Sequence, residues 1–91
     1  APSPVVELNR AVAVAMAFGP TAGLEIVDRL AAEPRLAQYQ WLPSVRGDLL
    51  EKLGRHAEAR AEFERAAALA GNAREQALLR ERARRLCCLL D

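Results

Sequence analysis

The stretch Gly47 to Ala66, GDLLEKLGRHAEARAEFERA, decides how the fold of the whole chain is interpreted. It is rich in alanine, leucine, glutamate and arginine, which are strong helix formers, and a single glycine, Gly54, interrupts it. A glycine at such a point ends a helix because it adopts a left-handed backbone conformation without steric cost. The stretch therefore predicts two helices joined by a tight turn at 54–56.

Small and aromatic side chains recur at helical spacing on both sides of this turn. Ala59, Phe63 and Ala66 share one face of the second helix. Gly47 puts a residue without a Cβ in the first helix, where two helices must approach closely. We expect the small residues to let the helices close up and Phe63 to fill the gap between neighbouring units.

Glycine, proline and capping residues divide the rest of the 91-residue chain in the same way. Ser3 and Pro4 are typical of a helix start, and Gly19-Pro20 of a stop followed by a new start. The predicted helices span 4–18, 20–32, 39–53, 57–70 and about 73–90, with a polar connector at 35–38 and Asn72 as the last N-cap. No segment alternates with period two. We therefore predict an all-α domain of five antiparallel helices.

The spacing of apolar residues supports helices throughout the chain, because it gives each of them an apolar stripe. For the helix 4–18 it selects Val5, Leu8, Val12, Ala15 and Met16. For the later helices it selects Leu24, Val27, Leu30, Ala31, Ala59, Phe63, Ala66, Ala67, Ala70, Leu79, Ala83, Leu86 and Leu90. The first helix is apolar around much of its circumference, so we expect part of it to stay exposed and to support a homodimer.

Composition excludes several classes of function. Thirteen basic and twelve acidic residues give a net charge of +1, which predicts no direct contact with nucleic acid. The longest apolar stretch, 11–19, is far shorter than the ~20 residues of a membrane span. The chain starts without methionine or a signal peptide, as expected for a piece of a longer cytoplasmic protein. Its two cysteines, Cys87 and Cys88, do not form a disulfide framework.

The sequence nominates no catalytic, cofactor or metal site, so we do not expect an enzyme. His56 is the only histidine, and no nucleophile motif accompanies it. Gly19 to Gly23 contains a proline and follows a predicted helix, which excludes a dinucleotide-binding loop. Adjacent cysteines such as Cys87 and Cys88 lack the spacing of zinc ligands.

Gly19 and Gly54 each end one helix and precede another, at nearly the ~34-residue period of tetratricopeptide repeats. The pattern resembles two such repeats followed by a capping helix. The second unit matches better than the first, in which Gly23 lies near the small position of the second helix. Arg46 stands where leucine is usual, and Gly71 replaces the usual proline.

Four runs carry a more specific resemblance: SPVVELNRAVAV at 3–14, GPTAGL at 19–24, LPSVRGDLL at 42–50 and LGRHAEA at 53–59. They are similar to the C-terminal tetratricopeptide-like extension of extracytoplasmic-function (ECF) RNA polymerase sigma factors. The resemblance implies that 1–91 is one regulatory interaction domain, without the two sigma domains. The implied partners are those sigma domains or RNA polymerase. The alternative is a general adaptor that binds an unrelated protein or peptide in its concave groove.

If Gly54 sets the register, the groove face carries Trp41, Ser44, Asp48 and Glu51 or Lys52 in the second unit. In the first unit it carries Val6, Asn9, Ala13 and Met16. Asn9 interrupts an apolar face, so it either bonds a neighbouring backbone from a buried position or holds the backbone of a partner.

Three further features have two interpretations each. Arg10 is either solvated and locally paired, or bonded to a part of the protein outside this sequence. Trp41 either packs on the preceding connector or anchors a partner. The arginines of the last helix form either a solvated face, with a Glu81–Arg85 pair, or a landing site for an acidic partner. The predicted partner-binding residues are Asn9, Arg10, Ala13, Trp41, Ser44 and Asp48.

Overall fold

The computed structural model describes residues 3–36 and 38–89, and their side chains as far as Leu86. Within these ranges the chain forms five α-helices and one short 3₁₀ helix, and no strand. The all-α prediction is confirmed. The elements are α1 (Pro4–Phe18), α2 (Pro20–Leu30), η1 (Pro34–Leu36), α3 (Trp41–Lys52), α4 (His56–Leu69) and α5 (Ala73–Leu89).

Local capping chemistry places both ends of α1 and the start of α5 where the sequence predicted them. The Val5 N–H donates to the Ser3 side-chain oxygen at 3.2 Å at the start of α1. Gly19, with φ +101°, separates α1 from α2. At the start of α5 the Glu75 N–H donates to Asn72 Oδ1 at 2.8 Å. These contacts confirm Ser3 and Asn72 as N-caps.

The turn at Gly54, between α3 and α4, caps the C-terminus of α3 with two backbone hydrogen bonds. Gly54 has φ +77°. Its N–H donates to the Glu51 carbonyl at 3.0 Å, and the Arg55 N–H donates to the Leu50 carbonyl at 2.9 Å. This pattern satisfies two carbonyls that the end of α3 would otherwise leave free. The chain can therefore reverse into α4 within a few residues.

The connector between α2 and α3 differs from the prediction. Helix α2 ends at Leu30 rather than Ala32, because the chain then tightens into turns in which the Ala32 N–H donates to the Arg29 carbonyl at 3.3 Å and the Glu33 N–H to the Leu30 carbonyl at 2.9 Å. The segment expected to be a polar connector contains the 3₁₀ helix η1, and Leu36 is 3% exposed there. The buried leucine packs the connector against the core. Helix α3 begins at Trp41, two residues later than predicted.

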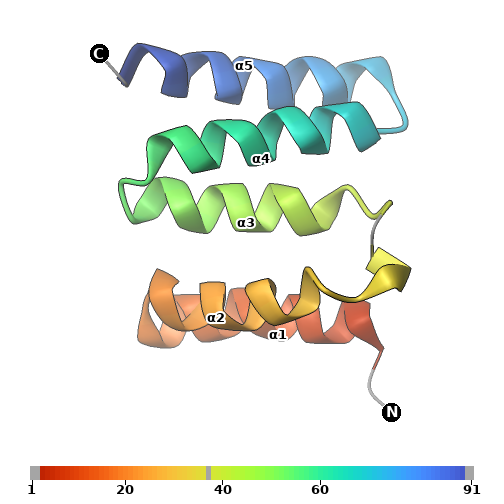
Figure 1. The fold of residues 1–91 in the computed structure, drawn as a ribbon, viewed down its shortest axis with the longest axis vertical. Coiled ribbons are helices and arrows are strands. Elements are labelled where there is room, and N and C mark those ends of the chain that lie inside the picture. Colours follow the sequence, from red (N-terminus) through yellow and green to blue (C-terminus); the bar gives the residue numbers. More distant parts are fainter. Residues whose placement is uncertain (1–2, 37, 90–91) are drawn as a thin grey trace.

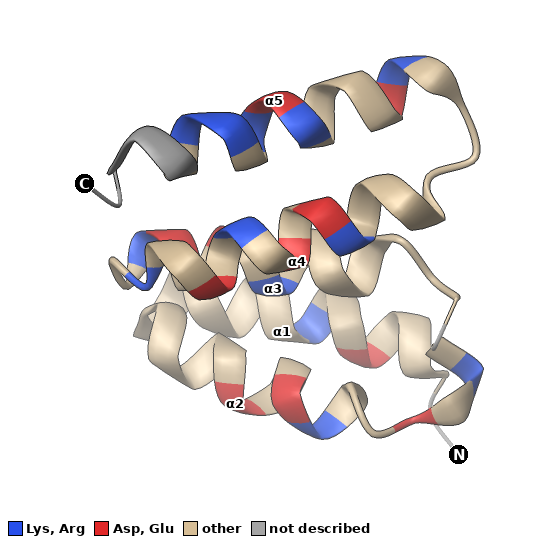
Figure 2. Cartoon of the chain, turned by 45° about the horizontal axis from the view of Figure 1, so that its top comes forward, with Lys and Arg blue, Asp and Glu red and all other residues tan. Residues whose placement is uncertain are grey.

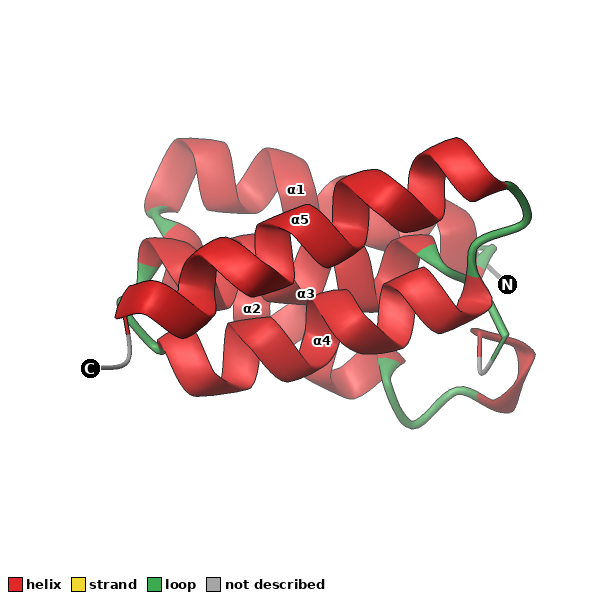
Figure 3. Ribbon diagram, turned by 90° about the horizontal axis from the view of Figure 1, so that it is seen from above, coloured by secondary structure: helices red, strands yellow, loops and turns green. Residues whose placement is uncertain are grey.

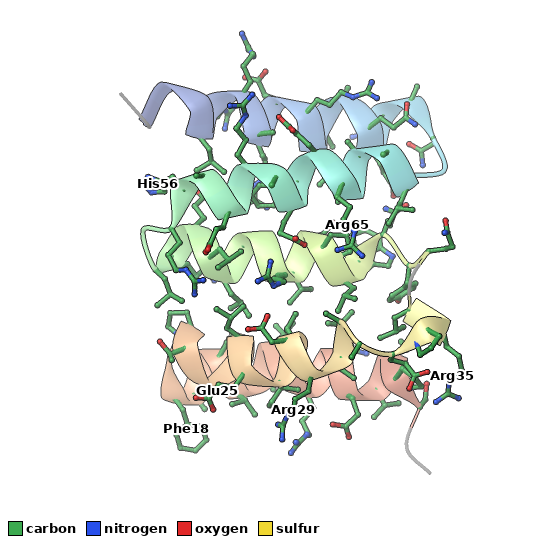
Figure 4. All side chains as sticks on the ribbon, viewed as in Figure 1. Phe18, Glu25, Arg29, Arg35, His56 and Arg65 are labelled. Carbon is green, nitrogen blue, oxygen red and sulfur yellow. The ribbon has the colours of Figure 1, made fainter. Side chains whose placement is uncertain are left out.

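The helices run back and forth in a single stack (Figure 1). The α1–α2 hairpin forms one end, followed by α3, α4 and α5. Seen from above, α1 and α5 lie toward one side, and α2 and α4 toward the other (Figure 3). Phe18, Glu25 and Arg29 project from the α1–α2 end (Figure 4).

Glycines permit the close helix contacts in both hairpins. A Cβ on Gly23 would lie 2.6 Å from Ala15 Cβ and 2.8 Å from the Ala11 carbonyl oxygen, so α1 and α2 touch there. A Cβ on Gly47 would lie 3.0 Å from the ring of Phe63, which is fully buried. The predicted role of Gly47 in close helix packing is confirmed.

Arg46, on α3, forms ion pairs with two other helices. Its Nε lies 2.8 Å from Asp28 Oδ1 on α2, and its Nη1 lies 3.1 Å from Glu62 Oε1 on α4. Glu62 is only 9% exposed. Partial burial lowers the pKa of Arg46, but the bonds to Asp28 and Glu62 outweigh it and raise the pKa above its usual value. Arg46 thus joins the α1–α2 hairpin to the α3–α4 hairpin.

Candidate interaction surface

The outward side of α1 is apolar and exposed, as the sequence predicted for part of this helix. Helix α1 buries Leu8 and Ala11, whereas Val5, Val12 and Met16 remain 39%, 38% and 82% exposed. These three members of the apolar stripe therefore lie outside the core. The apolar arc of α1 is wider than the contact with α2 and α3 requires. We call the exposed part the α1 face; it consists of Val5, Val6, Asn9, Val12, Ala13 and Met16.

The α1 face continues into a groove between α1 and α3. The groove has a volume of about 370 Å³ and contains one half-exposed aromatic side chain, Trp41. We call it the α1–α3 groove; it is lined by Val12, Ala15, Met16, Trp41, Ser44, Val45, Asp48, Leu49 and Lys52. The structure therefore brings together three of the six predicted binding residues, Trp41, Ser44 and Asp48.

The other three predicted residues lie on α1 but do not line this groove. Asn9 and Ala13 are exposed on the α1 face. Of the two interpretations of Asn9, the buried one is contradicted, because the residue is exposed. Arg10 pairs with Glu7 at 3.3 Å and borders a different groove, between α1 and α2. It is therefore locally paired, as one of its two interpretations expected.

The α1–α2 groove, about 360 Å³, has a different chemistry. Four of its seven lining residues are charged, two of each sign. Its lining is Glu7, Arg10, Ile26, Arg29, Leu30, Ala32 and Glu33. Because such a surface is well solvated without a partner, the α1–α3 groove is the stronger candidate for binding.

Trp41 is 47% exposed at the first turn of α3, where it lines the α1–α3 groove together with Met16. About half of the residue is therefore covered by the protein, and the other half is open to a partner. An aromatic residue at the mouth of an apolar groove is typical of an anchor for a partner. Val12, Ala15, Val45 and Leu49 also line the groove and were not predicted there; their only sequence signal is the broad apolar arc of each helix.

Asp48 forms the polar edge of the groove through contacts with two cations. Its carboxylate lies 3.0 Å from Lys52 Nζ and 3.1 Å from Arg82 Nη2, and Arg82 also reaches Glu51 at 3.1 Å. Partial burial raises the pKa of Asp48, but the bonds from Lys52 and Arg82 outweigh it and lower the pKa below its usual value. The edge is therefore neutral overall.

Arg82 also connects α5 to the core, because its guanidinium stands 4.2 Å from the centroid of the Phe63 ring. Charged residues recur along the rest of α5 (Figure 2). Glu81 takes part in the predicted pair with Arg85 at 3.4 Å. Leu78, 59% exposed, is the large apolar exception on this helix. These pairs favour the solvated interpretation of the α5 arginines.

Among the described residues, no group of histidine, cysteine and carboxylate side chains is placed to hold a metal ion. No helix in the described part of the chain has the length and apolar character needed to cross a membrane. The prediction for Cys87 and Cys88 falls outside the side chains that the structure describes.

Comparison with known proteins gives one informative relative. An uncharacterized protein of Rhizobium meliloti (strain 1021) is 53% identical over 79 residues, which are 87% of this chain and 18% of that protein. The chain thus spans less than a fifth of the relative's length. No family model matches the chain, and no solved structure matches it. The tetratricopeptide arrangement therefore stays a prediction.

Proposed function

We propose that this chain is a regulatory interaction domain of an ECF-type RNA polymerase sigma factor, built from tetratricopeptide-like hairpins and working in the cytoplasm. Its α1 face and α1–α3 groove contact the sigma domains of the same protein or RNA polymerase. The observation that carries the proposal is the uncharged, exposed α1 face beside a groove that contains Trp41. A surface of this kind on a small domain is typical of a protein contact.

The sigma-factor part of the proposal rests on the four sequence runs at 3–14, 19–24, 42–50 and 53–59. The relative from Rhizobium meliloti supports it indirectly, since in that protein the similar segment is a minor part of a much longer bacterial chain. Most charges near the surface are paired with each other, which favours a protein partner over DNA.

The mechanism in this proposal is non-covalent. Binding of the α1 face to the sigma domains stabilises one arrangement of the sigma factor over another and so changes the fraction that is active. A surface with a tenfold preference for one arrangement changes that balance by about 1.4 kcal/mol. No catalytic group is required.

The test has two steps. First, the sequence that the gene encodes upstream of this segment is inspected for promoter-binding helical domains. The proposal requires that such domains are present. The chain is then titrated calorimetrically against those domains and against core RNA polymerase at moderate salt. We expect saturable binding that weakens about tenfold in Trp41→Ala.

Leu78→Ala is the matched control, because Leu78 has a similar exposure but lies outside the groove. It should bind like the unmodified chain. Absence of upstream sigma domains, or of binding to either partner, would contradict the proposal and favour the general adaptor. Equal weakening in both variants would mean that the groove is not the contact.

A further inference from the structure

We infer that the occupant of the α1 face and the α1–α3 groove is an amphipathic α-helix of the partner, whose contacting stripe is apolar and uncharged. The inference rests on the proposed function for the role of this surface and specifies what it holds. It starts from the hydrogen-bonding groups that the surface offers and from its charge.

The groove offers few free groups for hydrogen bonding to a partner backbone. The Ser44 hydroxyl donates to the Gln40 carbonyl at 3.0 Å within its own helix. Asp48 is bonded to Lys52 and Arg82. An extended peptide carries backbone N–H and C=O groups that a largely apolar groove would leave unpaired. A helix satisfies its own backbone internally and needs only apolar contact.

The charge of the surface also restricts which side chains the partner helix can place on it. The α1 face contains no charged residue, and the only charges in the groove, Asp48 and Lys52, pair with each other at 3.0 Å. A charged side chain of the partner would lose water here without gaining a counter-charge. The stripe that contacts α1 must therefore be uncharged, with the charges of the helix on its far side.

The dimensions of the surface also fit a helix. Helix α1 has 15 residues, so it is about 22 Å long at 1.5 Å per residue. Val5, Val12 and Met16 form a ridge along it at spacings of seven and four, and the groove runs beside this ridge. Ridges of this kind pack into the grooves of a second helix. A partner helix of about 15 residues would cover the surface.

Asn9 lies on the α1 face between Val5 and Val12, and the structure gives its side chain no hydrogen bond within the described residues. One polar residue in an apolar helix contact fixes register at a cost in affinity. Under a helical occupant, Asn9→Leu therefore tightens binding to an all-leucine stripe. Under an extended occupant the same change removes a backbone clamp and weakens binding.

The test uses two synthetic peptides of about 16 residues with identical composition of leucine, glutamine, lysine and glutamate. In one, the leucines recur every three and four residues; in the other, they alternate with polar residues. Trp41 is the only tryptophan in the chain and lies in the groove, so its fluorescence reports occupancy directly. Far-UV circular dichroism reports any gain of helix, since a free peptide of this length is marginally helical.

We expect the helically spaced peptide to shift Trp41 emission to the blue and to gain helix, and the alternating peptide to do neither. We expect Met16→Glu to weaken binding at least about tenfold, Leu78→Glu to change it less than about twofold, and Asn9→Leu to strengthen it. Nuclear magnetic resonance spectra of each variant check that it remains folded.

Three results would overturn the inference. The first is equal binding of both peptides, and the second is tighter binding of the alternating peptide. The third is that neither peptide binds the chain while the sigma domains or RNA polymerase still bind it. Sedimentation of the chain alone provides a further check. If it dimerises and Trp41 emission shifts with its own concentration, the occupant is a second copy and the partner helix is wrong. Binding of the helical peptide without any binding of sigma domains or polymerase would instead contradict only the proposed function.

Discussion

Helices α1 and α5 lie toward the same side of the stack, at its two ends, yet their outward sides have opposite chemistry (Figures 2 and 3). The α1 face exposes valine, alanine and methionine with a single asparagine, and the charged residues of this helix, Glu7 and Arg10, pair with each other outside that face. Helix α5 exposes arginine and glutamate in pairs, and Arg82 fastens it to α3. A charged outer side is stable in water by itself, whereas a continuous apolar side gains free energy when it is covered. This contrast is the basis of our proposal that the domain binds its partner through α1 rather than through α5.

The largest effect should come from the aromatic residue beneath α5. Phe63→Ala removes a fully buried ring that packs on Gly47 and Arg82, and we expect it to lower the free energy of unfolding by about 3–5 kcal/mol. Phe18→Ala, on a ring that is 79% exposed at the α1 end, should change it by less than about 0.5 kcal/mol. Urea unfolding measures both. Similar losses would mean that the two ends do not differ as described.

A smaller loss of stability should follow from removing the ion pairs of Arg46, which join the α1–α2 hairpin to the α3–α4 hairpin. Arg46→Ala leaves Glu62, a buried carboxylate, without its nearest cation, and we expect a loss of about 1–3 kcal/mol in unfolding free energy. Arg65→Ala is the matched control, because Arg65 lies 3.9 Å from the same carboxylate and is half-exposed. Equal losses of unfolding free energy in the two variants would show that Arg46 stabilises the fold no more than an exposed arginine near Glu62.

The smallest effect concerns pH and the edge shared by α3 and α5. The pKa of Asp48 is lowered by Lys52 and Arg82 from its usual value of 3.8. Its contribution to stability is therefore complete above the unfolded pKa and is lost as pH falls through the folded pKa. Because the side chain is 40% exposed, we expect less than about 1 kcal/mol.

Asp48→Asn should remove this part of the acid dependence. The measurement is the urea midpoint of both proteins between about pH 5 and pH 2.5. If the two proteins show the same fall in midpoint, the ion pairs on this edge do not contribute as described.

The helix ends were predictable because their chemistry is local. Ser3, Gly19, Gly54 and Asn72 act through neighbours a few residues away, and each ends or begins a helix where expected. The face of α4 around Phe63 was predictable for a similar reason, since its apolar stripe is narrow and has one possible orientation.

Two features could not be predicted from the sequence. The apolar arc of α1 is wide enough to contain both a buried and an exposed half, and no local signal says which half of it, Leu8 or Met16, faces the core. Arg46 finds its partners Asp28 and Glu62 at 18 and 16 positions away, so its role depends on how the helices stack. Asn9 lies on the same arc, so the sequence left open whether it is buried or exposed.

The most direct test of the contrast between α1 and α5 places the same charge on each. Met16→Glu and Leu78→Glu both substitute an exposed apolar residue, at 82% and 59% exposure, and should leave folding intact. Each variant is titrated by calorimetry against the sigma domains or RNA polymerase. We predict that Met16→Glu weakens binding at least about tenfold while Leu78→Glu stays within about twofold of the unmodified chain. Undiminished binding of Met16→Glu, or greater weakening in Leu78→Glu, would contradict the claim that the domain binds through α1.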